Sequence, residues 1–164
     1  MNMLLIKRAQ KHDTDAFIEL IEKNKTALYK VAKAYLKNEE DIADAMQDTI
    51  LSAYEHIGEL RVVSYFKTWL TRILINHCTD TLRRQRRVIP MKQTGEQAGT
   101  SLESNYEFYE LLQELPEQDR ILFLLYYGEG FSIREIADIM ECNENTVKSR
   151  LQRGRKKLEH VLSC

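Results

Sequence analysis

The sequence is poor in the residues that interrupt helices, because its 164 residues include only six glycines and two prolines. Sandwiches and barrels built from many β-hairpins need such residues at their turns, so we expect an all-α protein. Hydrophobic residues make up 43% of the chain, which is enough to build buried cores and excludes a disordered chain.

Cysteine is scarce as well. Cys78, Cys142 and Cys164 form no C-x-x-C pair, so neither a disulfide framework nor a zinc site is expected. No stretch approaches the ~20 apolar residues of a membrane span, and the short apolar run before Lys7 is too brief for a signal peptide. We therefore expect a cytoplasmic protein that needs no metal or cofactor.

The net charge of −1 hides an uneven distribution of 24 basic and 25 acidic residues. Between Gln93 and Asp119 lie seven acidic residues and no Lys or Arg, and residues 94–101 contain no aromatic or large aliphatic side chain. This composition is typical of a flexible linker. Since both flanking segments have helical periodicity, we predict two small helical domains, residues 1–88 and 106–164, joined by a linker at 89–105.

Three helices are predicted in the first domain. The first carries apolar residues at three- and four-residue steps from Phe17 to Tyr35. The second is capped by Asn38, and its expected buried stripe comprises Ile42, Ala45, Met46, Thr49, Ile50, Ala53 and Ile57. The third opens after Ser64, and its apolar side comprises Phe66, Trp69, Leu70, Ile73 and Leu74.

Two surfaces of this domain carry charge. Opposite the stripe of the second helix lie Asp41, Asp44, Gln47, Asp48 and Glu55, which form either a solvated face or a docking surface for a basic partner. Without a metal-ligand set or a nucleophile these carboxylates make no catalytic site, so we expect no enzyme. The third helix combines aromatic residues with Lys67, Arg72 and the arginines after Leu82, which suits single-stranded nucleic acid. Phe66 and Trp69 are nevertheless expected in the core, because they fall on one side with Ile73, and Tyr65 is left open. For the arginines, the alternative is a solvated helix end.

The second domain has the layout of a helix-turn-helix. A helix at Tyr106–Leu115 is followed by one that Pro116 opens, with Ile121, Leu122, Leu124 and Leu125 on its core side. Gly128 and Gly130 end that helix. Ser132 and Glu135 have capping-box spacing, and Asn143 is expected to cap the last helix after a turn at Glu141-Cys142.

The last helix separates apolar from polar residues. Val147, Leu151, Gly154 and Leu158 fall on one side and are expected to be buried, while Asn145, Ser149, Gln152 and Lys156 lie opposite. Six cations between Lys148 and Lys157 have no acid among them, whereas an ordinary surface helix interleaves Glu to form i,i+4 pairs. This favours a helix that binds DNA phosphates and base edges, with an ordinary surface helix as the alternative.

Two stretches resemble one family. Asp41-Ile-Ala-Asp-Ala-Met-Gln-Asp48, Phe66-Lys-Thr-Trp-Leu70, Asn76, Asp80 and Leu82-Arg-Arg84 resemble region 2 of the extracytoplasmic-function (ECF) sigma factors of bacterial RNA polymerase. Leu115-Pro116, Phe131-Ser-Ile-Arg-Glu-Ile-Ala137, Thr146-Val-Lys-Ser-Arg-Leu151, Arg153 and Arg155 resemble region 4. The resemblance implies an alternative sigma factor of the sigma-70 family that directs promoter-specific initiation in a stress or cell-envelope response.

The resemblance also implies roles for individual residues. In the family the acidic helix docks on the clamp helices of the polymerase β′ subunit, which here implies Asp41, Asp44, Gln47 and Asp48. The next loop and helix engage the minus-ten promoter element, and the matching residues are Arg61, Tyr65, Lys67, Arg72, Asn76, Asp80, Arg83 and Arg84. The last helix reads the minus-thirty-five element, and the matching residues are Asn145, Thr146, Lys148, Ser149, Arg150, Gln152, Arg153 and Arg155. The β flap of the polymerase and an anti-sigma factor, which could hold the protein at the membrane, are further implied partners.

The chain departs from the family pattern at three places. Arg61-Val-Val-Ser-Tyr-Phe66 replaces the Arg-Gly-Glu-Ser-Ser-Phe loop of many members, which implies a different minus-ten preference. Glu141-Cys142 replaces Gly-Ile in the turn. Gly154 replaces an Ala, which lowers the stability of the helix by roughly 1 kcal/mol. A stand-alone DNA-binding regulator is the alternative hypothesis, and it would leave the acidic helix without a purpose.

Overall fold

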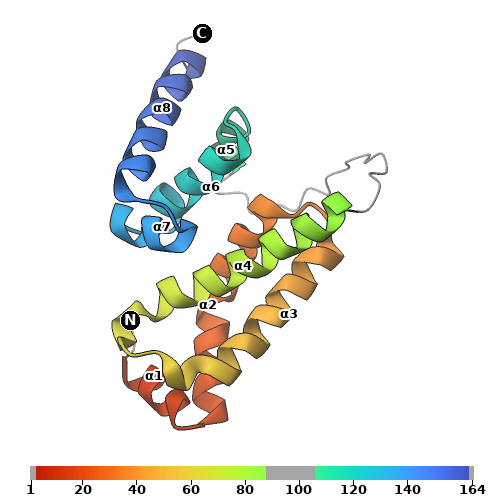
Figure 1. Ribbon diagram of the computed structural model, residues 1–164, viewed down its shortest axis with the longest axis vertical. Helices are drawn as coiled ribbons and strands as arrows, with labels where there is room; N and C mark the ends of the chain where they lie inside the picture. Colours follow the sequence, from red (N-terminus) through yellow and green to blue (C-terminus); the bar gives the residue numbers. More distant parts are fainter. Residues whose placement is uncertain (1–2, 88–105, 163–164) are drawn as a thin grey trace. The chain divides into compact units, whose positions relative to one another are not determined.

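All regular structure in residues 3–87 and 106–162, the parts of the chain that the computed structural model describes, is helical (Figure 1). The expected all-α class is confirmed for these residues. The chain divides into an N-terminal unit and a C-terminal unit, each with its own core. The predicted linker at 89–105 lies outside the described residues.

The N-terminal unit consists of four helices and two short 3₁₀ turns. In chain order they are α1 (Met3–Gln10), α2 (Thr14–Tyr35), α3 (Glu39–His56), η1 (Ile57–Glu59), η2 (Val63–Tyr65) and α4 (Phe66–Arg87). Helices α2, α3 and α4 pack against one another, and α3 runs along α4 (Figure 1). Helix α1 packs on α2 and on both 3₁₀ turns, so it supports the segment that leads into α4.

Polar caps fix where the helices of this unit begin. The Asn38 side chain accepts hydrogen bonds from the backbone N–H groups of Glu40 and Asp41, which confirms the predicted cap of α3. Asp13 caps α2 in the same way, and Arg8 forms an ion pair with it. The Ala16 N–H, followed by the Arg8 guanidinium, lowers the pKa of Asp13 below its ordinary value.

The core of the N-terminal unit follows the predicted stripes except at four residues on its edge. Every predicted core residue of α2 is buried, and so are Ile42, Ala45, Thr49, Ala53 and Ile57. Met46 and Ile50 are only half-buried. On α4, Phe66 is buried as expected, but Trp69 and Ile73 are half-buried because they lie at the rim, while Ile75 and Cys78 fill the interior instead.

The C-terminal unit is built from α5 (Tyr106–Leu112), α6 (Glu117–Phe123), the π-helical turn η4 (Leu124–Gly128), α7 (Ile133–Met140) and α8 (Glu144–Leu162). The helix predicted to reach Leu115 ends earlier, at Leu112. The next three residues form tighter i→i−3 bonds, and Pro116, which lacks an N–H, then stands at the N-cap of α6. The predicted core residues of α6 and η4 are buried.

The turns around α7 match the predicted signals. Gly130 adopts a φ of +76°, a conformation that favours glycine, and ends the segment after η4. Ser132 and Glu135 form the complete capping box of α7. Asn143 Oδ1 accepts the Thr146 N–H at 2.8 Å, so the predicted cap of α8 is confirmed too.

Helix α8 buries the predicted side, which comprises Val147, Leu151, Gly154 and Leu158. Gly154 has a packing reason that the sequence does not reveal. A Cβ atom at this position would lie 2.4 Å from Cε1 and 2.7 Å from Cζ of Phe123, a ring that is buried between α6 and α8. Glycine therefore lets α8 approach α6 closely, and its lower helix propensity is offset by this contact.

Candidate functional site

The acidic face of α3, which we define as Asp44, Gln47 and Asp48, is exposed. It lies opposite the buried stripe, as expected from the sequence. Asp41 differs from the other members of the predicted set, because it is half-buried and its Oδ2 accepts a hydrogen bond of 2.7 Å from Gln85 on α4. Asp41 thus ties α3 to α4, and the acidic face begins one turn later.

Two apolar residues of the same face were missed by the sequence analysis. Leu51 is 58% exposed and Tyr54 is 46% exposed. At ~100° per residue, Leu51 projects between the directions of Gln47 and Asp48. Tyr54 is fixed by an edge-on contact with Phe17, with ring centroids 5.1 Å apart. The sequence did contain a sign of their exposure, since neither residue belongs to the apolar stripe of the helix. Leu51 and Tyr54 therefore add exposed apolar area beside the carboxylates of the acidic face.

The segment before α4 is held by a residue that the sequence analysis did not single out. Gln10 Nε2 donates hydrogen bonds to the carbonyl oxygens of Ile57 at 2.9 Å and Leu60 at 2.8 Å. Between η1 and η2, Arg61 and Val62 are exposed, whereas Tyr65, the last residue of η2, is half-buried. The end of α1 therefore positions the loop whose residues were expected to contact the minus-ten element.

Most of the predicted minus-ten residues of α4 share one face. Arg72, Asn76, Asp80 and Arg83 are exposed and recur at steps of three and four residues, with Arg84 at the edge of this row. Lys67 projects from roughly the opposite side of the helix, at ~100° per residue, and is half-buried. The structure therefore groups five of the six charged or amide residues predicted on α4 and separates Lys67 from them.

The arginines at the end of α4 keep most of their positive charge available. Arg83 pairs with Asp80 at 2.9 Å, but both side chains are more than half exposed. Such a surface pair is worth only about 0–1 kcal/mol and is readily exchanged for a phosphate. Arg84 is close to the Thr81 hydroxyl, and within the described residues Arg86 and Arg87 form no ion pair. This end of α4 is an accessible basic surface.

The outer face of α8 presents the predicted polar residues. Asn145, Lys148, Ser149, Gln152, Arg153 and Arg155 are exposed, while Thr146 and Arg150 are half-buried. The Thr146 hydroxyl donates to Asn143 Oδ1 at 3.0 Å, so it also completes the cap of the helix. Amide, hydroxyl and cationic groups on one helix face can contact base edges and phosphates together.

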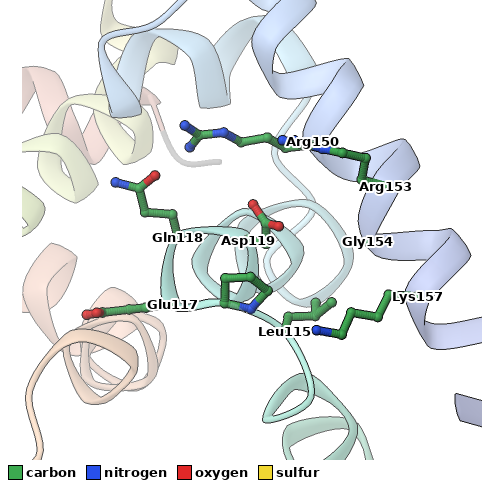
Figure 2. Close-up of a pocket in the computed structure, with 9 residues that line it drawn as sticks. Leu115, Glu117, Gln118, Asp119, Arg150, Arg153, Gly154 and Lys157 are labelled. Atoms are coloured by element: carbon green, nitrogen blue, oxygen red, sulfur yellow. The ribbon is translucent and has the colours of Figure 1, made fainter.

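The two flanks of α8 differ in their surroundings. On one flank an open cleft of about 560 Å³ separates α8 from the start of α6 (Figure 2). Arg150, Arg153 and Lys157 line one wall, and Glu117 and Asp119 line the other, so the cleft is of mixed charge. On the other flank Arg155 Nε donates to the hydroxyl oxygen of Tyr127 at 2.7 Å. Tyr127 was also missed from the sequence, although it is 49% exposed.

Two family models match the chain. Residues 20–88 match the family Sigma-70 region 2, and residues 106–158 match the family Sigma-70, region 4. The RNA polymerase sigma factor SigV of Bacillus subtilis is 32% identical over 143 residues, which cover 85% of this chain and 86% of that protein. The ECF RNA polymerase sigma factor SigM of Mycobacterium tuberculosis is 31% identical over 158 residues, which cover 92% of this chain and 79% of that protein.

Solved structures give the same result. CnrH, solved in complex with the cytosolic domain of CnrY, is 25% identical with a TM-score of 0.71, and the match covers 98% of this chain and 96% of that one. The sigma factor RpoE of Bartonella quintana, solved with the anti-sigma factor NepR, is 26% identical with a TM-score of 0.71, covering 90% and 96%.

Two sigma-70 regions in this order define a class of transcription initiation factors. The chain belongs to the sigma-70 family, as one of its ECF sigma factors. It is therefore an alternative sigma factor of bacterial RNA polymerase, which directs transcription initiation. Within the described residues, no helix is both long and apolar enough to cross a membrane.

Proposed function

We propose that the protein uses three separate surfaces to select promoters and has no catalytic chemistry of its own. Residues 1–88 act as region 2, residues 89–105 as a linker and residues 106–164 as region 4. The acidic face of α3 binds the clamp helices of the polymerase β′ subunit, α4 with its preceding loop binds the minus-ten element, and α8 binds the minus-thirty-five element. Region 4 also contacts the β flap.

The observation that carries this proposal is the separation of charge between exposed helix faces. Asp44 and Asp48 are exposed on α3, whereas between Lys148 and Lys157 the α8 helix has six cations and no acid. An acidic face suits a basic protein surface, and a helix stretch that carries several cations and no acid of its own suits a polyanion. One chain thus offers complementary surfaces to both the enzyme and its template.

Docking on the polymerase is proposed to combine charge with apolar contact. Asp44 and Asp48 supply the long-range attraction, while Leu51 and Tyr54 supply surface that can be removed from water.

We expect Asp44→Arg with Asp48→Arg to abolish co-purification with core polymerase. Glu19→Arg with Glu22→Arg on α2 is the matched control, because it makes the same change of charge at exposed residues and should leave co-purification intact. Retention of polymerase by the α3 variant would contradict the proposed docking face.

Recognition of the upstream element is assigned to the outer face of α8. Asn145 carries an amide that can contact a base edge, and Lys148 carries a cation that can reach a phosphate or a base. Each good base contact contributes about 1–3 kcal/mol of discrimination. We expect Asn145→Ala and Lys148→Ala to weaken initiation at promoters that the wild type selects in transcription-start mapping. Unchanged start-site selection by both variants would refute this assignment.

Contact with the minus-ten element is assigned to the exposed row Arg72, Asn76 and Arg83 and to Arg61 in the preceding loop. The residues of the α4 row face solvent on one side of that helix, where they could follow a single-stranded backbone, and Arg61 is exposed in the preceding loop. We expect Arg72→Ala with Asn76→Ala to reduce strand opening while leaving co-purification with polymerase unchanged. Normal opening of the promoter, measured with permanganate at unpaired thymines, would refute the assignment.

Regulation by an anti-sigma factor is proposed from the similar structures, two of which are described as complexes with CnrY and with the anti-sigma factor NepR. Such a partner would keep the protein inactive, at the membrane if the partner is anchored there, until a stress or cell-envelope signal releases it. Affinity capture from cells before and after envelope stress tests this. A partner that is present in both states in equal amount would contradict the regulatory role.

A further inference from the structure

Arg155 of α8 and Tyr127 of η4 form a pre-arranged pair on the flank of the helix-turn-helix. Arg155 Nε donates to the Tyr127 hydroxyl oxygen at 2.7 Å, and the guanidinium carbon lies 5.9 Å from the centroid of the ring. An exposed arginine ordinarily samples many rotamers. The contact with Tyr127 restricts this freedom, so less conformational entropy is lost when the guanidinium binds a ligand.

The tyrosine is itself held in place by its neighbours. Its ring centroid lies 5.4 Å from that of Phe123 and 4.9 Å from that of Tyr126, which it meets edge-on. Phe123 is buried against Gly154, the residue next to Arg155. Gly154 therefore has a second consequence: by admitting the Phe123 ring, it sets the position of Tyr127 beside Arg155.

The pair has hydrogen-bond donors that no other described residue uses. A guanidinium carries five N–H donors, and only the Nε–H is engaged by Tyr127. The tyrosine hydroxyl accepts that bond and keeps its own hydrogen to donate. Within the described residues Arg155 forms no ion pair. Several donors around one cation suit a phosphate group, whose oxygens only accept.

The place of the pair in the fold indicates the kind of molecule that carries this phosphate. In the homeodomain, a three-helix variant of the helix-turn-helix, the segment between the first two helices and the end of the third contact the DNA backbone. Tyr127 is the penultimate residue of η4, close to the segment that joins η4 to α7, and Arg155 lies in the second half of α8. We propose that Tyr127 and Arg155 clamp one backbone phosphate of duplex DNA, with Tyr127 as the residue that positions the guanidinium.

This inference rests on the proposed binding of α8 to DNA and adds to it a contact that carries no base sequence. Backbone contacts fix the register of a protein on the duplex, whereas base contacts select the sequence. A duplex of arbitrary sequence is therefore a sufficient probe, and the promoter of this sigma factor need not be known. Loss of the clamp should weaken binding to all sequences to a similar extent.

The test measures binding of the full-length protein to a short fluorescent duplex of mixed sequence at increasing KCl concentrations. Arg155→Ala should lower the slope of log affinity against log salt by about 0.9, the value for one phosphate. Tyr127→Phe removes one hydroxyl and should weaken binding about three- to tenfold at low salt. Tyr126→Phe is the matched control, because it removes a neighbouring hydroxyl with no hydrogen bond to the described residues, and it should leave binding unchanged.

The double variant separates positioning from an independent contact. If Tyr127 acts through Arg155, Tyr127→Phe should have little further effect in the Arg155→Ala background, and additive losses would overturn that role. An unchanged salt slope for Arg155→Ala, together with a reduced slope for Lys148→Ala, would overturn the clamp and leave α8 as a DNA-binding helix. If neither variant changes binding, both the clamp and the proposed DNA surface are refuted. Thermal melting, monitored by circular dichroism, checks that each variant is folded.

Discussion

Replacing Gly154 by alanine probes the close contact between α6 and α8. The new Cβ atom would lie 2.4 Å from Cε1 and 2.7 Å from Cζ of Phe123. Carbon atoms in good contact are about 3.5–4.0 Å apart, so either the ring or the helix must move. Phe123 is only 3% exposed and also packs against Tyr127, so a shift of the ring would disturb its other contacts.

Two opposing effects set the magnitude. Alanine is more favourable than glycine in a helix by about 1 kcal/mol. Adding a methyl group to a filled core costs about 1–3 kcal/mol. We therefore expect Gly154→Ala to lower the free energy of unfolding of the C-terminal unit by about 0–2 kcal/mol, with ~1 kcal/mol as the central value. In a unit of this size that corresponds to a fall in melting temperature of roughly 4–8 °C.

The two units allow an internal control within one sample. Trp69 is the single tryptophan of the chain and lies on α4, so its fluorescence reports on the N-terminal unit. Far-ultraviolet circular dichroism reports on both units. Gly154→Ala should shift the dichroism transition in urea and leave the Trp69 transition unchanged. Gly58→Ala is the matched control, because no atom lies within 4 Å of the added Cβ, and it should be neutral or stabilising by about 0.4–1 kcal/mol.

A second substitution tests the cause directly. Phe123→Leu removes the ring atoms that the added methyl group would meet, so Gly154→Ala should be much less harmful in that background. The two substitutions should couple by about 0.5–3 kcal/mol. An increase in stability on Gly154→Ala in the otherwise unchanged protein would show that α8 does not depend on this close approach, and our explanation of the glycine would be wrong.

Three further predictions concern the core, a cap and the loop before α4. Burial raises the pKa of the Cys78 thiol to about 12 from an ordinary 9.0. The stability that comes from burying the neutral thiol is therefore fully present below pH 9, and it is lost progressively as the pH rises from 9 towards 12. Urea titrations followed by Trp69 fluorescence should show this loss, and it should be smaller in Cys78→Ala. Ser132→Ala removes the capping box of α7 and should destabilise the C-terminal unit by about 1 kcal/mol in thermal melts, whereas an unchanged melting curve would contradict the role of the cap. Gln10→Ala removes two hydrogen bonds and should lower the free energy of unfolding of the N-terminal unit by roughly 1–3 kcal/mol. Amide hydrogen exchange in residues 57–62 should become faster. Exchange at the wild-type rate there would show that α1 does not hold the loop.

Much of the helical structure was readable from local sequence signals. Caps act over three or four residues, which is why Asn38, Asn143 and the Ser132–Glu135 box were predicted and then found. The side of α8 that faces the core also follows from periodicity alone, because a helix repeats its faces every 3.6 residues. By contrast, α1 was not predicted, since an eight-residue helix has too few repeats to give a clear period.

The sequence by itself determined which helix faces are apolar, acidic or basic, because these depend only on residue type and helical repeat. Only the tertiary structure decided which polar residues remain accessible to a partner. It placed Asp41 against Gln85 and Tyr127 against Arg155. It also gave the reason for Gly154, since the Phe123 ring that needs its space lies on another helix. These contacts join residues far apart in the chain, and no local pattern encodes the distance between two helices.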